Sequence, residues 1–149
     1  MALNGARVCA MPMTPDAVVR SWFNEIWNEG REEAIDRLAD DNFIAHGAPS
    51  LRSTADFRVV YQQFRQALSD INITVERTVT QGDYCAGYCR VKARHTGDGF
   101  GAAPTNRIVE FDGVVMARVR DGKIVEGWNC FDFLSMYQQI GWVNNPPTP

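Results

Sequence analysis

Apolar residues recur at two different periods along the chain, one in the first half and the other in the second. Between Thr14 and Gly30 they recur every three or four residues, which is the spacing of one face of an amphipathic helix. Thr14 is a suitable N-cap, Pro15 suits the first helical position, and Gly30 is a suitable terminator. The apolar residues of this predicted helix are Val18, Val19, Trp22, Phe23, Ile26 and Trp27.

Two further helices are predicted before the period changes. A short helix covers residues 32–40, and a brief extended segment follows over residues 42–46. Pro49 and Ser50 interrupt that segment, and Ser53 with Asp56 forms a capping pair for a third helix. The apolar face of the third helix consists of Phe57, Val60, Tyr61, Phe64 and Leu68.

From Ile71 onward, apolar and polar residues alternate, as in strands with one buried face. The alternation predicts long strands, separated by a turn at Gly82–Asp83, a Gly- and Pro-containing loop at 97–106 and a hairpin at Asp121–Gly122. We expect the 97–106 loop to act as a lid. The pattern predicts an α+β fold, in which three N-terminal helices cover the concave face of a curved, mixed or antiparallel sheet and form a cone with an apolar interior.

Length and charge restrict the class of protein. The chain has 149 residues, which suits one domain, and we expect a flexible tail over residues 1–12 and a single domain over 13–149. The net charge of −3 argues against a nucleic-acid-binding surface or a basic membrane-binding surface. No apolar run approaches the roughly 18 residues of a membrane-spanning helix, so we expect neither nucleic acid nor membrane as a partner.

The cysteines indicate a reducing compartment. Cys85 and Cys89 are four residues apart in a predicted strand, so their Cα atoms would be about 13 Å apart, too far for a disulfide. No signal-peptide core precedes the predicted domain, and we therefore expect free thiols and a cytoplasmic location. Neither the cysteines nor the two histidines have the spacing of a metal site, and we expect no metal and no cofactor.

The alternation in the last strand separates candidate site residues from surface residues. Val125, Gly127, Asn129, Phe131 and Phe133 share the face with fewer charges, which we assign to the cone interior. Glu126 then points outward, and the outward acids of the preceding strand can pair with Arg90, Lys92 and Arg94. Asn129 can orient a carbonyl or hold a water molecule, but it has no group that titrates and cannot serve as a general base. A buried Asn satisfied by the backbone is the alternative.

The two histidines are the candidates for acid–base catalysis, because their ordinary pKa lies near neutrality. His95 ends a strand beside the loop, and His46 ends the short extended segment, so both are expected at the rim of the cone. The alternative for each is a rim histidine bonded to the backbone. The apolar interior is suited to a hydrophobic small molecule. The residues expected to contact it are Asn129, Tyr61, Trp22, Phe23, Trp27, Val115, Phe131 and Cys89.

Two segments carry a family resemblance: VVRSWFNEIWNEGREEAIDRLADDNFIAHG, and HTGDGFGAAPTNRIVEFDGVVMARVRDGKIVEGWNCFDFLSMYQQIG. They resemble the SnoaL-like polyketide cyclase and ester cyclase family of the nuclear transport factor 2-like superfamily. The resemblance implies the cone-shaped α+β fold, also called cystatin-like, and a homodimer formed through the outer face of the sheet.

The resemblance also implies positions for a catalytic set. In polyketide cyclases of this family an acid on the last strand works with a His and a Gln on the preceding strand and an Asn on the short early strand. Those positions hold Asn129, Val115, Gly113 and Ala45 here, so none of the four residue types matches.

Three functions therefore stay open at the level of sequence. The first is a lyase, isomerase or cyclase acting on a hydrophobic carbonyl or cyclic substrate. The second is a ligand-binding protein without catalysis. The third is a dimeric interaction module that uses the outer sheet face.

Overall fold

The computed structural model describes residues 11–47 and 49–144. Two helices and a π-helical segment precede the first strand: α1 (Pro15–Ser21), η1 (Trp22–Asn28) and α2 (Ala34–Leu38). Then follow β1 (Ala39–His46), α3 (Thr54–Ala67), β2 (Leu68–Gln81), β3 (Tyr84–His95), β4 (Ile108–Arg120), β5 (Lys123–Phe131) and α4 (Phe133–Gln139). Residues 1–10, most of the expected flexible tail, lie outside the described residues.

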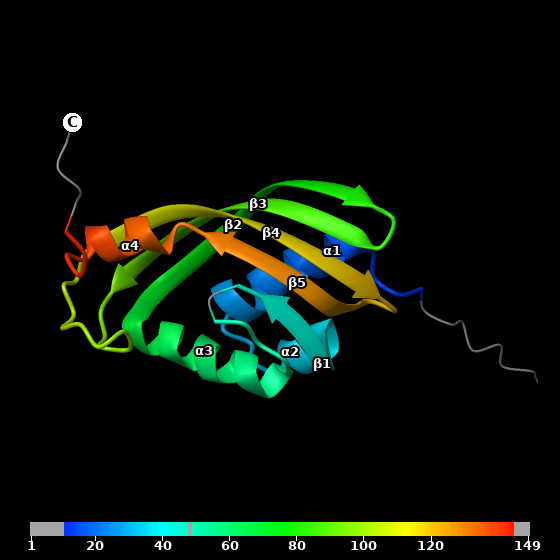
Figure 1. Cartoon of the computed structure of the whole chain (residues 1–149), viewed down its shortest axis with the longest axis horizontal. Helices are drawn as coiled ribbons and strands as arrows, with labels where there is room; N and C mark the ends of the chain where they lie inside the picture. Colours follow the sequence, from blue (N-terminus) through cyan, green and yellow to red (C-terminus); the bar gives the residue numbers. More distant parts are fainter. Residues whose placement is uncertain (1–10, 48, 145–149) are drawn as a thin grey trace, which may run out of the picture.

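The strands form one curved sheet in the order β1-β5-β4-β3-β2. β1 pairs parallel with β5, and the other neighbours pair antiparallel, so the sheet is mixed and β1 and β2 are its edges. Figure 1 shows α1, α2 and α3 on the concave side, and α4 at one end of the molecule beyond β5. The predicted α+β class and the helix-covered concave face are confirmed, and the sheet is open rather than a closed barrel.

The predicted helix boundaries have the expected local causes. The Thr14 hydroxyl accepts a hydrogen bond from the Ala17 N–H at 3.2 Å, and the Ser53 hydroxyl accepts one from the Asp56 N–H at 3.1 Å. Gly30 has a φ of +71°, a conformation that favours glycine, and it follows the end of η1. No described helix is both long and apolar enough to cross a bilayer.

Two elements differ from the sequence-based prediction. The first long helix continues as the π-helical segment η1 from Trp22, which widens the turn that presents Trp22 and Phe23 to the interior. The short second helix ends at Leu38, because the chain already pairs with β5 from Ala39 onward. Residues 39 and 40 therefore belong to β1 rather than to the helix.

A β-bulge corrects the predicted faces of the last strand. The register between β4 and β5 shifts between Arg118 and Val119, so that Arg118 pairs with Glu126 but Val119 pairs with Ile124. Val125 is the extra residue, and the side chains before it are turned to the opposite face. Ile124 is therefore buried on the inner face, where Val125 was expected, while Gly127, Asn129 and Phe131 keep their predicted inner positions.

The outer face carries the predicted cross-strand ion pairs. Lys92 lies 2.8 Å from Glu110, and Arg90 lies 3.7 Å from Asp112. These side chains are largely exposed, so each pair contributes little to stability.

The edge strand β2 is hydrogen-bonded by a helix side chain instead of a sixth strand. The Asn28 side chain donates to the Ile73 carbonyl at 2.9 Å and accepts from the Ile73 N–H at 2.6 Å. The register of β2 against β3 shifts next to this point, between Val75 and Arg77. Asn28 thus fastens η1 to the edge of the sheet in the way a neighbouring strand would.

We predict that Asn28→Ala lowers the free energy of unfolding by about 2 kcal/mol, because two partly buried backbone groups of Ile73 lose their partner. The matched control is Asn24→Ala, which removes an exposed hydrogen bond from the same segment and should change stability by less than about 0.5 kcal/mol. Urea denaturation of the two variants measures the difference. Equal effects would show that the Asn28 contact does not hold the strand edge.

Candidate functional site

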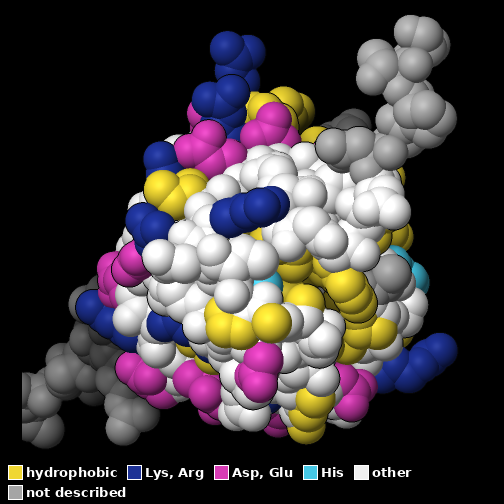
Figure 2. All heavy atoms as spheres, turned by 90° about the vertical axis from the view of Figure 1, so that its left-hand side faces the viewer, with side chains coloured by type: hydrophobic (Ala, Val, Ile, Leu, Met, Phe, Trp, Pro, Cys, Tyr) yellow, Lys and Arg dark blue, Asp and Glu magenta, His cyan; other side chains and the backbone are white. Residues whose placement is uncertain are grey.

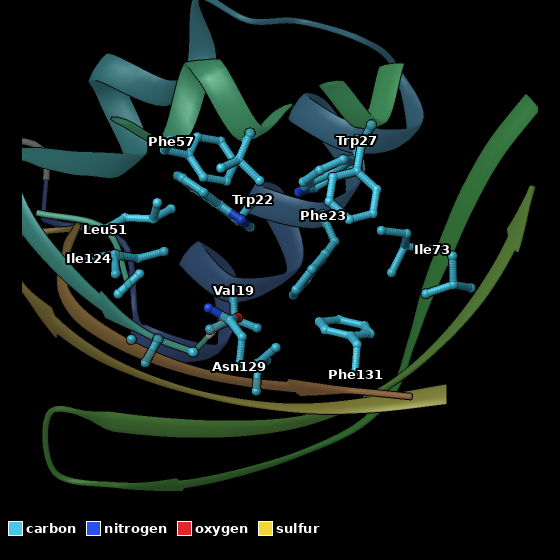
Figure 3. A pocket seen from close by; sticks show the side chains of 18 of the residues that line it. Val19, Trp22, Phe23, Trp27, Leu51, Phe57, Ile73, Ile124, Asn129 and Phe131 are labelled. Carbon is cyan, nitrogen blue, oxygen red and sulfur yellow. The ribbon is translucent and has the colours of Figure 1, made fainter. Parts of the chain in front are cut away.

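A cavity of about 170 Å³ lies between the concave face of the sheet and the helices. Its walls are mainly aromatic and aliphatic side chains, and the labelled ones in Figure 3 converge from η1, α3 and the strands. Figure 2 views the end of the molecule that carries α4, where apolar side chains line a hollow in the surface. The aromatic members of the lining are Trp22, Phe23, Trp27, Phe43, Phe57, Phe64, Phe111, Phe131 and Phe133.

The sheet side of the cavity is built from rows of residues that are neighbours across strands. One row consists of Ala45, Gly127 and Ala117, which are paired in register across β1, β5 and β4. The next row contains Asn129 and Val115, which are also paired. All three residues of the first row line the cavity. Their small side chains therefore leave space that the helices do not fill.

The following row is filled by a single ring. Gly113 pairs with Phe131, and a Cβ atom at Gly113 would lie only 2.1 Å from the Phe131 ring. The glycine therefore allows this ring to lie across the sheet. Phe131 then contacts Phe23 and Phe111 edge-on, with ring centroids 6.3 and 6.4 Å apart.

The cavity opens where β1 ends. β1 pairs with β5 only as far as His46 and Trp128, so Asn129 is at the free edge of β5. Gly47, Pro49 and Asn129 line the cavity and are exposed, whereas Trp22, Phe43 and Ile124 line it and are buried. Asn129 thus stands at the opening, with the apolar cavity behind it.

Among the described lining residues, Asn129 is the one with a polar side chain apart from the indoles of Trp22 and Trp27, and none is ionisable. The Asn129 side chain is exposed at the opening, so its donor and acceptor are open to a bound molecule. Figure 3 shows this amide directed into the cavity. The predicted inward position of Asn129 is confirmed, and the amide can hold a carbonyl or hydroxyl group.

His95 is fully buried but does not line the cavity. Its Nδ1 accepts a hydrogen bond from the Thr105 N–H at 3.3 Å and lies 3.0 Å from the Thr105 hydroxyl. The neutral ring then carries its proton on Nε2, which has no partner among the described residues. His95 thus holds the base of the 97–106 loop through the Thr105 backbone. This arrangement matches the alternative given for a rim histidine, which is a bond to the backbone rather than catalysis.

The 97–106 loop, expected to be a lid, is docked against the end of α3. A Cβ atom at Gly97 would lie 1.8 Å from the Gln66 carbonyl oxygen, and one at Gly99 would lie 2.3 Å from that of Gln63. Phe100 packs edge-on against Phe64, with ring centroids 5.1 Å apart. These contacts hold the loop at the end of the core.

His46 lies on the outer face of the sheet, which corrects the expectation that it lines the rim of the pocket. Its Nε2 is 2.9 Å from Glu126 Oε1, and Arg118 Nη2 is 3.1 Å from the other oxygen of the same carboxylate. The imidazole also stacks on Trp128, with ring centroids 5.1 Å apart. The structure therefore does not bring His46 and His95 together in the cavity.

Two of the residues expected to contact a ligand belong to the core instead. Cys89 is fully buried, lies outside the cavity lining, and burial raises the pKa of its thiol to about 11. The Tyr61 hydroxyl donates to the Ile26 carbonyl at 3.1 Å, and burial raises the pKa of the phenol. Both groups are therefore protonated near neutral pH, and neither lines the cavity.

The other predicted ligand contacts do line the cavity: Trp22, Phe23, Trp27, Val115, Asn129 and Phe131. Phe43, Phe57, Ile124 and Gly127 also line the cavity, and none of them was among the predicted ligand contacts. The apolar spacing of the third helix could have indicated Phe57. Ile124 could not be found by alternation, because the bulge at Val125 reverses its face.

The sequence profile of the SnoaL-like polyketide cyclase family matches residues 17–140. IdmH from Streptomyces antibioticus, described as a candidate polyketide cyclase, is 28% identical with a TM-score of 0.76, over 87% of this chain and 99% of that one. AclR from Streptomyces galilaeus, described as a candidate hydroxylase, is 22% identical with a TM-score of 0.79, over 90% and 85%.

A candidate SnoaL-like polyketide cyclase from Jannaschia sp. CCS1 is 17% identical with a TM-score of 0.79, over 92% of this chain and 96% of that one. Among curated proteins, none matches the chain significantly. The two structures under 25% identity show the shared fold, while the family profile covers the helices, the sheet and the cavity together. The chain belongs to the SnoaL-like polyketide cyclase family.

Proposed function

We propose that this protein binds a hydrophobic carbonyl compound in the cavity, with the carbonyl oxygen accepting a hydrogen bond from the Asn129 amide. The observation that carries the proposal is the composition of the described lining: many apolar side chains, one amide at the opening, and no ionisable group. An apolar pocket with one placed polar group favours a ligand that is apolar except at one point.

The size of the cavity limits the part of the ligand that it can enclose. An engineered apolar cavity of about 150 Å³ in another protein binds benzene. The cavity here is about 170 Å³ and is open at Asn129. It can therefore enclose about one ring with a short substituent, while a larger molecule extends past the opening.

The residues in the cavity also limit the chemistry. General acid–base catalysis needs a group that exchanges a proton near the working pH, and the described lining supplies none. An amide donor can polarise a carbonyl, and the aromatic walls can hold a flexible chain in a folded conformation. We therefore propose that the cyclase-like activity of this cavity is the positioning of a folded chain for ring closure, with any proton that moves exchanged with solvent water at the opening.

Binding without turnover is the second candidate function. It is favoured by the same absence of an ionisable side chain in the described lining, since a carrier needs only the cavity and the amide. The two functions differ in whether a bound open-chain compound is recovered unchanged or cyclised.

We predict that Asn129→Ala weakens the binding of butyrophenone, an aryl ketone, by about 3- to 10-fold, because one hydrogen bond to the carbonyl is lost. The matched ligand is n-butylbenzene, which lacks the carbonyl and should bind the wild-type protein and the variant equally. Isothermal titration calorimetry measures both. An equal loss for the two ligands would show that Asn129 does not contact the carbonyl.

The affinity of the wild-type protein for butyrophenone should also be constant from pH 5.5 to 8. No described lining residue is ionisable, and the two histidines lie outside the lining. The same titration repeated across this range checks the prediction, and His46→Gln should give the same flat profile. A sigmoidal dependence on pH would contradict the proposed role of a neutral cavity.

We also propose a homodimer through the outer face of the sheet. Ala86, Met116 and Trp128 are in register across β3, β4 and β5 on this face, beside the row Tyr88, Val114 and Cys130. Val114 and Met116 are 51% and 37% exposed, so the center of the sheet presents apolar side chains to solvent. A second copy of the chain would cover this surface.

We predict that the double variant Val114→Asp, Met116→Asp is a monomer while the wild-type protein is a dimer, because the interface would bury unpaired carboxylates. The control is Leu134→Asp on α4, which is as exposed but lies off the sheet. Size-exclusion chromatography with light scattering measures the masses. A monomeric wild-type protein, or a double variant that stays dimeric, would contradict the proposed interface.

A further inference from the structure

The cavity has two halves that differ in chemistry, one on each side of Asn129. Figure 3 shows Leu51 and Ile124 on one side of the Asn129 side chain, and Trp27, Ile73 and Phe131 on the other. The first half has the row Ala45, Gly127 and Ala117 as its sheet side. We call it the small-residue half, and we call the half around Phe131 the aromatic half.

The inner face of the sheet carries three glycines, and they differ in what occupies the space where a side chain would be. At Gly113 the space is taken by the Phe131 ring, 2.1 Å from a built Cβ. A Cβ atom at Gly87 would be in ordinary van der Waals contact with the side chains of Val115, Val19 and Val75, at 3.5 to 3.6 Å. At Gly127 a Cβ would meet only the Met116 carbonyl oxygen, at 3.8 Å.

Gly127 is therefore the inner-face glycine whose side-chain space is not occupied by the protein. Its φ is outside the left-handed region, so the backbone does not require glycine at this position. Gly127 lines the cavity, and it lies two residues before Asn129 on the same face of β5. The open space thus begins beside the amide that is proposed to hold the carbonyl.

The aromatic half is suited to a flat group. The Phe131 ring meets Phe23 edge-on, and the Trp27 ring meets Phe64 edge-on, with ring centroids 6.3 and 6.0 Å apart. Aromatic rings in such an arrangement favour edge and offset contacts with a further unsaturated ring. The small-residue half, with aliphatic Leu51 and Ile124 beside glycine and alanine, is suited to a thicker saturated group.

We infer that the ligand is a ketone-type compound with an unsaturated, flat group on one side of the carbonyl and a saturated chain on the other, and that the space above Gly127 selects the length of this chain. The inference rests on the proposed function, since it assumes that the carbonyl is bound at Asn129. Gly127 is then a specificity-determining residue.

The test uses alkyl phenyl ketones of increasing chain length: acetophenone, propiophenone and butyrophenone. Each added methylene that becomes buried should tighten binding to the wild-type protein by about fourfold. In Gly127→Val the valine methyls occupy the space of the chain. We expect this variant to lose the gain with chain length, so that it binds butyrophenone no more tightly than acetophenone.

Two further variants complete the design. Gly127→Ala adds one methyl group where the nearest atom is 3.8 Å from the Cβ, and it should fold and lose part of the gain with chain length even where Gly127→Val does not fold. Phe133→Leu alters a ring of the lining outside the small-residue half. It should weaken all three ketones by the same factor and keep the fourfold gain per methylene.

The outcomes separate this inference from the proposed function. A chain-length gain that persists in Gly127→Val would overturn the inference, while binding of the ketones would leave the proposed function in place. Failure of the wild-type protein to bind any of the three ketones at millimolar concentration would overturn the proposed function, and the inference with it. Loss of the gain in Gly127→Val, with retention in Phe133→Leu, would support both.

Discussion

The concave face of the sheet alternates between rows of small and large side chains, and the cavity depends on this alternation. A curved sheet covered by helices normally fills its interior, because empty space forfeits packing contacts. Here the row Ala45, Gly127 and Ala117 is too small to reach the helices. The π-helical segment η1 places Trp22 and Phe23 opposite, and the bond between Asn28 and Ile73 holds that segment at the edge of the sheet.

The separation of charge between the two faces follows from the same period of two. Side chains that alternate along β4, β5 and β1 place Arg118, Glu126 and His46 together on the outer face, where water and mutual ion pairs stabilise them. The inner face of the same strands receives Val115, Gly127 and Asn129. The charged side chains of these strands therefore lie on the side of the sheet opposite the cavity, and the cavity itself is neutral among the described residues.

Much of the fold follows from the sequence, because helix caps, hairpin glycine and the two hydrophobic periods are local signals. Ser53, Thr14 and Asp121–Gly122 have the predicted positions. The bulge at Val125 is not a local signal, because it arises from the pairing between β4 and β5. It turns the Ile124 side chain to the face opposite the one that alternation predicts. His46 was misplaced for a related reason: the parallel pairing of β1 with β5 sets its face, and neither strand alone reveals it.

The candidate site was predictable only in part, because alternation assigns a residue to a face but not to an empty space on it. Cys89 and Val115 both face inward, yet Cys89 is covered by the core while Val115 borders the cavity. What distinguishes them is the size of the neighbours across the sheet and the reach of the helices above. Family membership has the same limit, since a shared fold fixes where a cavity can form, and the side chains inside it decide the chemistry. The resemblance to polyketide cyclases implies an acid at the position of Asn129. An amide there can form a hydrogen bond but cannot transfer a proton, which supports the proposed binding and positioning rather than acid–base catalysis.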